Sequence, residues 1–166
     1  MKRTLQLTCL MLAVFVTACT REYPCAVPYV TPQFIGFTTN ELDTVIVRKY
    51  PKEGDWQTVI DSVVWVLGQN AQAQIFTDSV IISPTLVGYY IHPDFDWQIE
   101  LPSLSRQFWI DQITYTPITK SCGYGIFSMD KMGCACISPL VSARLNNRVI
   151  TFNESTVDGR FLNISR

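Results

Sequence analysis

Asp94-Phe95-Asp96-Trp97-Gln98-Ile99-Glu100-Leu101 is the segment of this chain with the clearest alternation of polar and apolar residues. Successive side chains of a β-strand point to opposite faces. The alternation therefore gives one aromatic and aliphatic face and one polar face, with Phe95, Trp97, Ile99 and Leu101 on the first. We predict that the apolar face packs into a core and that the acidic face is solvated, where it discourages pairing at a sheet edge.

Short runs of the same kind recur on both sides of this stretch. They are rich in β-branched and aromatic residues, and turn residues separate them. No segment of helical length repeats apolar residues every three or four positions, and a single helical turn is predicted near 138–145. We therefore predict an all-β domain, an antiparallel β-sandwich with little helix. An immunoglobulin-like order is one option, although the Cys-Trp-Cys pattern is missing. The predicted strands are 34–37, 44–50, 59–67, 74–82, 86–92, 95–101, 108–116, 125–129, 149–153 and 161–165.

The beginning of the chain has the parts of a secretory signal. Lys2-Arg3 precede an apolar run, 10–16, that is too short to span a membrane, and small residues follow it. Val16-Thr17-Ala18-Cys19 resembles a bacterial lipobox, which implies removal of residues 1–18 and a lipid on Cys19. Several acyl chains would give a stable membrane anchor. The alternative is a secreted protein in which Cys19 is incidental.

The residues after the signal are predicted to form a tether and one domain. Residues 19–33 carry three prolines at four-residue spacing and are predicted to be a stiff, extended tether. Residues 34–166 are long enough for one domain. Of the 13 Lys and Arg residues two lie in the signal, whereas all 14 Asp and Glu residues follow it. This mildly acidic balance predicts no nucleic-acid partner.

Four cysteines remain after Cys9 is lost with the signal and Cys19 is lipidated: Cys25, Cys122, Cys134 and Cys136. An even number in an exported protein predicts two disulfides. A bond between Cys134 and Cys136 would be strained. We therefore favour one bond from Cys122 to a member of that pair, with Cys25 bonded to the other. A site of four thiolates for zinc is the alternative, but it lacks the usual spacing, so we predict no metal or cofactor.

Catalytic motifs are absent from the sequence. The only histidine, His92, precedes Pro93 and lies at a predicted strand end. Asp94 and Asp96 would suit glycoside hydrolysis only if they faced each other across a cleft. We predict a protein that is not an enzyme, with a carboxylate-based hydrolase as the least favoured alternative.

Two pairs of adjacent aromatic residues are candidates for binding. Tyr89-Tyr90 and Phe108-Trp109 lie in predicted strands, so one ring of each pair should point away from the core. Either the outward ring is covered by the tether or a loop, or it contacts a ligand. Flat rings suit both sugar faces and protein partners. All four residues are therefore candidate ligand contacts.

A lipobox, a proline-rich tether and one β domain together resemble the small lipoproteins of Bacteroidetes. Asp43-Thr44-Val45, Asp61-Ser62-Val63 and Asp78-Ser79-Val80 also resemble the O-glycosylation motif of those bacteria. Thr20 after Cys19 implies sorting to the outer membrane of the cell envelope, facing the periplasm or the outside. The expected function is a lipid-anchored, non-catalytic lipoprotein that binds an envelope protein or a glycan. The alternative is a structural or accessory component of an envelope assembly.

Overall fold

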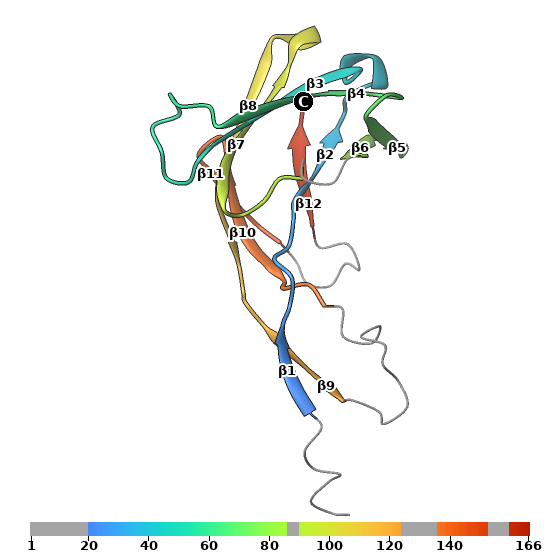
Figure 1. Cartoon of the computed structure of the whole chain (residues 1–166). Coiled ribbons are helices and arrows are strands. Elements are labelled where there is room, and N and C mark those ends of the chain that lie inside the picture. Colours follow the sequence, from blue (N-terminus) through green and yellow to red (C-terminus); the bar gives the residue numbers. More distant parts are fainter. Residues whose placement is uncertain (1–19, 86–89, 124–135, 153–159) are drawn as a thin grey trace, which may run out of the picture. The chain divides into compact units, whose positions relative to one another are not determined.

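The computed structural model describes residues 20–85, 90–123, 136–152 and 160–166 (Figure 1). The described chain is all-β, as predicted, and contains only two short 3-10 helices, Thr39–Glu41 and Pro102–Leu104. It divides into two units. The smaller unit comprises Met1–Ala26 and Pro117–Ser138, and the larger comprises Val27–Thr116 and Pro139–Arg166.

In the smaller unit, the described residues form a pair of antiparallel strands. Strand β1 (Thr20–Pro24) pairs with β9 (Thr119–Gly123). Directly after β1, Cys25 forms a disulfide with Cys136. The peptide N–H of Ala26 donates to the carbonyl of Cys136 at 3.0 Å. The segment predicted to be a stiff, extended tether therefore contains a paired strand.

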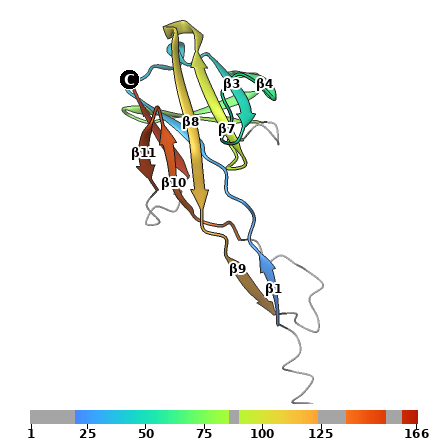
Figure 2. The same cartoon turned by 90° about the vertical axis from the view of Figure 1, so that its left-hand side faces the viewer.

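The larger unit has a six-stranded antiparallel sheet in the order β11-β10-β8-β7-β3-β4. Figure 2 shows β7 and β8 side by side, with β10 and β11 beyond β8. The bounds are β3 (Thr44–Pro51), β4 (Asp61–Val66), β7 (Phe95–Leu101), β8 (Arg106–Tyr115), β10 (Leu140–Leu145) and β11 (Arg148–Thr151).

A four-stranded sheet in the order β12-β2-β6-β5 completes the larger unit. Its strands are β2 (Thr31–Ile35), β5 (Ala71–Ile75), β6 (Ser79–Pro84) and β12 (Phe161–Ser165). The β2–β12 pair is parallel, in contrast to the predicted antiparallel pattern. Pro32, which has no N–H to donate, lies beyond the end of the β2–β6 ladder.

The two sheets of the larger unit share one hydrophobic core, so the unit is a β-sandwich. Trp97, Ile99 and Phe108 of the larger sheet belong to the same buried cluster as Phe34 and Ile164 of the smaller one. The strand order differs from that of an immunoglobulin domain. There the first two strands are neighbours in one sheet, whereas here β2 and β3 lie in different sheets.

In strand β7, the predicted burial of the apolar face of residues 94–101 is confirmed, whereas the predicted exposure of the polar face is wrong for two residues. Trp97, Ile99 and Leu101 are buried in the core. Asp96 and Gln98, predicted to be solvated, are only 3% and 4% exposed. The reason is that β7 is a central strand between β3 and β8, and residues that cover its outer face belong to β3, β8 and the loop 52–60.

Several predicted boundaries were also wrong. Residues 140–145, expected to include a helical turn, form strand β10, because both of its edges pair with neighbours. The predicted strand 74–82 is divided by a turn at 76–78, where the N–H of Phe76 donates to the carbonyl of Ser79 at 2.8 Å. Strand β2 begins at Thr31, within the predicted tether. The predicted strand 125–129 and residues 86–89 lie outside the described residues.

Candidate functional site

A pocket of about 290 Å³ lies on the outer face of the four-stranded sheet. Thr31 of β2 is paired with Phe161 of β12, and Gln74 of β5 with Ile81 of β6, so these side chains share one face. The core residues of the same strands, such as Phe34 and Ile82, point to the other face. The lining residues are Tyr29, Thr31, Gln74, Ile81, Ser83, Tyr90, Arg160 and Phe161.

Two tyrosines and an arginine form a stack at this pocket. The ring centroids of Tyr29 and Tyr90 are 4.5 Å apart, with the ring planes tilted by 37°. The guanidinium carbon of Arg160 lies over the Tyr29 ring, 4.7 Å from its centroid. These three residues come from distant parts of the sequence, so the fold itself assembles the stack.

Backbone hydrogen bonds hold the three residues in place. The N–H of Val30, next to Tyr29, donates to the carbonyl of Ile91, next to Tyr90, at 2.8 Å. The N–H of Thr31 donates to the carbonyl of Arg160, also at 2.8 Å. The stack therefore rests on paired backbone at the start of β2 and β12, which is a rigid support for a binding surface.

Arg160 gives the pocket a positive charge. It is the only charged residue among the described residues that line the pocket, and within the described part of the chain it has no ion-pair partner. The other polar groups of the described lining residues are an amide and four hydroxyls, on Gln74, Thr31, Ser83, Tyr29 and Tyr90. This combination can stack a ring, accept and donate hydrogen bonds, and attract an anion.

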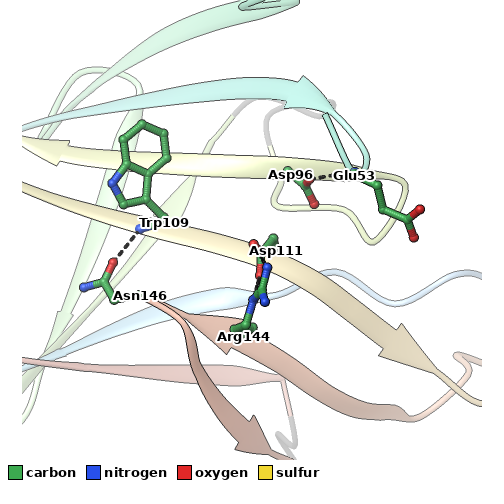
Figure 3. Close-up of polar contacts among 6 residues, drawn as sticks. All are labelled: Glu53, Asp96, Trp109, Asp111, Arg144 and Asn146. Carbon is green, nitrogen blue, oxygen red and sulfur yellow. Dashed lines mark hydrogen bonds and ion pairs between the residues drawn. The ribbon is translucent and has the colours of Figure 1, made fainter. Parts of the chain in front are cut away.

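A second aromatic cluster lies on the outer face of the six-stranded sheet. The ring of Trp109 is 4.7 Å from that of Trp56 and 6.0 Å from that of Tyr50, centroid to centroid. Trp56 belongs to the loop 52–60 and has a φ of 61°, which is strained for a bulky residue. The N–H of Trp109 donates to Oδ1 of Asn146 at 2.8 Å (Figure 3). In this cluster the loop covers the outward ring, which is the alternative to ligand binding.

Beside this cluster, carboxylates stabilise the loop and the neighbouring strand. Oδ2 of Asp96 accepts the N–H of Glu53 at 2.8 Å, and Asp111 binds Arg144 through two contacts of 2.6 Å (Figure 3). Oδ1 of Asp96 is buried and has no hydrogen-bond partner among the described residues. Burial raises the pKa of Asp96, the hydrogen bond from Glu53 opposes the shift, and the negative charge of Asp111 adds to it.

His92 does not meet these carboxylates. Its Nδ1 lies 3.3 Å from Oδ2 of Asp94, and its carbonyl accepts the indole N–H of Trp97 at 2.9 Å. Asp96 and Asp111 face outward on the other sheet, beside the Trp56–Trp109 contact. No histidine or carboxylate is among the described residues of the pocket.

The predicted ligand-contact residues are divided among different places. Tyr90 lines the pocket. Trp109 belongs to the covered aromatic cluster, and Phe108 is buried in the core against Phe37, so neither is carried into the candidate site. Tyr89 lies outside the described residues. The expectation that one ring of the Phe108-Trp109 pair points away from the core is confirmed.

The sequence interpretation missed Tyr29 and Arg160. Tyr29 was assigned to the tether, and Arg160 precedes the last predicted strand. No local pattern connects them, because their proximity depends on the parallel pairing of β2 with β12.

The cysteines agree in part with the prediction. The bond between Cys25 and Cys136 is one of those expected. Cys19, Cys134 and the side chain of Cys122 lie outside the described residues. Within the described part of the chain, no group of three His, Cys, Asp or Glu residues is arranged to hold a metal ion.

Comparisons with family models, curated proteins and solved structures found no match to this chain. Over the described ranges, no helix has the length and apolar character needed to span a membrane.

Proposed function

We propose that this chain is a lipid-anchored lipoprotein of the bacterial envelope and that its β-sandwich domain binds a glycan. The observation that carries the binding proposal is the pocket in which Tyr29, Tyr90 and Arg160 are stacked. The lipobox-like Val16-Thr17-Ala18-Cys19 supports the anchor.

The composition of the pocket favours a sugar over a protein surface. Sugar rings present C–H groups on their faces and hydroxyls on their edges. Tyrosine rings suit the faces, and the side chains of Thr31, Gln74 and Ser83 suit the edges. A protein partner usually contacts about 20–30 residues on each side, whereas eight described residues line this concave site.

The size of the pocket also limits what it holds. Small-molecule sites range from about 300 to 1,000 Å³, and this pocket, at about 290 Å³, lies just below that range. It therefore fits one sugar residue of a longer chain, with the remainder of the glycan outside.

The proposal is tested with the full chain, extracted from membranes in a mild detergent and applied to an array of bacterial, plant and animal oligosaccharides. We expect binding to a subset of glycans, and we expect Tyr90→Ala to weaken it at least tenfold, about 1.4 kcal/mol. The matched control is Phe76→Ala, which removes a 52% exposed aromatic ring outside the pocket and should leave binding unchanged. Failure to bind any glycan, or equal loss in both variants, would overturn the proposal.

A further inference from the structure

We infer that the pocket selects an acidic sugar, one that carries a carboxylate, and that Arg160 is the residue that recognises this group. This inference rests on the proposed glycan binding and names the chemical class of the ligand. It follows from the charge of the pocket, the arrangement of the arginine and the position of the stacked rings.

Among the described residues, no acidic side chain neutralises the charge of Arg160 in the pocket. The described lining residues include no Asp or Glu, and no ion pair of Arg160 is present in the described part of the molecule. A half-buried guanidinium without a carboxylate partner attracts an anion more strongly than an exposed one, because less water screens it.

The contact with Tyr29 orients the guanidinium for this role. Arg160 places its guanidinium carbon over the ring, 4.7 Å from the centroid. A cation–π contact of this kind does not use up the N–H donors of the guanidinium, and a pair of these donors matches the two oxygens of a carboxylate. The carbonyl of Arg160 is fixed by the N–H of Thr31, so the backbone that carries the side chain is held at the pocket.

The tyrosines place a sugar ring beside the guanidinium. Tyr90 lies 4.5 Å from Tyr29, on whose ring Arg160 is stacked. The carboxylate of a uronic acid projects from the edge of its pyranose ring. A ring that packs on the tyrosine pair therefore brings its carboxylate toward the guanidinium, while its hydroxyls reach the polar side chains of the sheet.

The test compares each sugar with its own uncharged form. The full chain in detergent is titrated by calorimetry with oligosaccharides of glucuronate, galacturonate and mannuronate, each as the free acid and as the methyl ester. We expect at least one free acid to bind ten or more times more tightly than its ester, and the difference to shrink as NaCl is raised. Because the protein is unchanged in this comparison, misfolding of a variant cannot produce the result.

Variants then assign the preference to one residue. Arg160→Ala should remove the difference between acid and ester, and Arg160→Lys should retain only part of it, because lysine lacks the fork of N–H donors. Arg148→Ala makes the same change of charge at an exposed site outside the pocket and should preserve the preference. Thermal unfolding of each variant shows whether it is folded.

The other outcomes separate this inference from the proposed function. Equal binding of acid and ester that still depends on Tyr90 would overturn the acidic-sugar inference and leave glycan binding intact. Preference for sulfated over carboxylated sugars would also overturn it. Binding only to peptides with a free C-terminal carboxylate, or to no saccharide, would overturn both.

Discussion

Asp96 is a carboxylate held out of water on a central strand of the six-stranded sheet. The groups that act on it are the N–H of Glu53, the charges of Glu53 and Lys52, and Asp111, which is itself bound to Arg144. Burial dominates and raises the pKa of Asp96 above its ordinary value of 3.8. The folded protein therefore keeps a proton on Asp96 at a pH where the unfolded chain has lost it.

This shift predicts a particular dependence of stability on pH. Since the folded state binds more protons in that window, the contribution of Asp96 to the free energy of unfolding falls as pH rises above 3.8. Asp96→Asn does not titrate and can still accept the N–H of Glu53. We expect the stability of Asp96→Asn relative to wild type to be higher at pH 7 than at pH 4, measured by urea unfolding at both values. A difference that is independent of pH, or larger at pH 4, would contradict the assignment.

The burial of Asp96 also shows why single residues were hard to predict. Alternation in the sequence placed Asp96 on the correct face of its strand. It could not predict that this face is covered, because the cover depends on the loop 52–60 and on Trp56 with its positive φ. The alternation of polar and apolar residues along a strand does not show whether a loop covers one of its faces.

Among the secondary-structure elements, β12 contributes to both the pocket and the hydrophobic core. It pairs with β2 through parallel bonds and carries Leu162 and Ile164 into the core, and Arg160 directly precedes it. Strand β12 therefore contributes side chains to the core of the sandwich, and the residues at its start line the pocket.

The burial of β12 predicts that two side-chain substitutions of similar size lower the free energy of unfolding by different amounts. Ile164 is 0% exposed, whereas Val149 on the edge strand β11 is 67% exposed. Ile164→Ala should lower the free energy of unfolding by about 2–5 kcal/mol, and Val149→Ala should change it by less than about 0.5 kcal/mol. Chemical denaturation of both variants measures this, and similar effects at the two positions would mean that β12 is not packed in the core.

The existence of most strands could be predicted from local pattern, but their partners could not. The segments 44–50, 95–101, 108–116 and 161–165 agree closely with β3, β7, β8 and β12. The parallel β2–β12 pair joins segments at opposite ends of the domain, and period-two alternation does not report on such a partner. Strand β10 was missed because its ladder with β8 contains register shifts that obscure the alternation.

For the whole molecule, the pairing of the cysteines in disulfides can be tested directly. Cys25 is bonded to Cys136, which leaves Cys122 and Cys134 to form the second bond. Peptide mapping by mass spectrometry without reduction should recover a linked peptide for each pair. Recovery of a Cys25–Cys122 peptide, or of Cys122 and Cys134 as free thiols, would contradict this pairing.

The anchor is a separate prediction about the whole chain. Cys19→Ala should abolish incorporation of an alkyne-labelled fatty acid in a bacterial host and leave the protein unprocessed or soluble, because the proposed lipid is attached through the thiol of Cys19. Cys9→Ala is the matched control and should be labelled normally. Labelling and membrane attachment that persist in Cys19→Ala would exclude the lipoprotein assignment.

The candidate site was predictable only in part. Tyr90 was singled out because two adjacent aromatics in a strand cannot share a face. Tyr29 and Arg160 could not be found in this way, since neither lies in an informative pattern and the stack forms only when β2 and β12 pair. Binding sites assembled by long-range pairing are visible in the fold and not in any one segment.

Glycan binding at the pocket is tested most directly by nuclear magnetic resonance of the full chain in detergent. The tyrosine rings are labelled, and their signals are assigned through Tyr→Phe variants. When an oligosaccharide that bound on the array is added, we expect the ring signals of Tyr29 and Tyr90 to shift. We also expect magnetisation transfer from those rings to the sugar C–H protons. Tyr50, in the cluster with Trp56 and Trp109, should not respond. Unchanged Tyr29 and Tyr90 signals, or a response confined to Tyr50, would show that the pocket is not the glycan site.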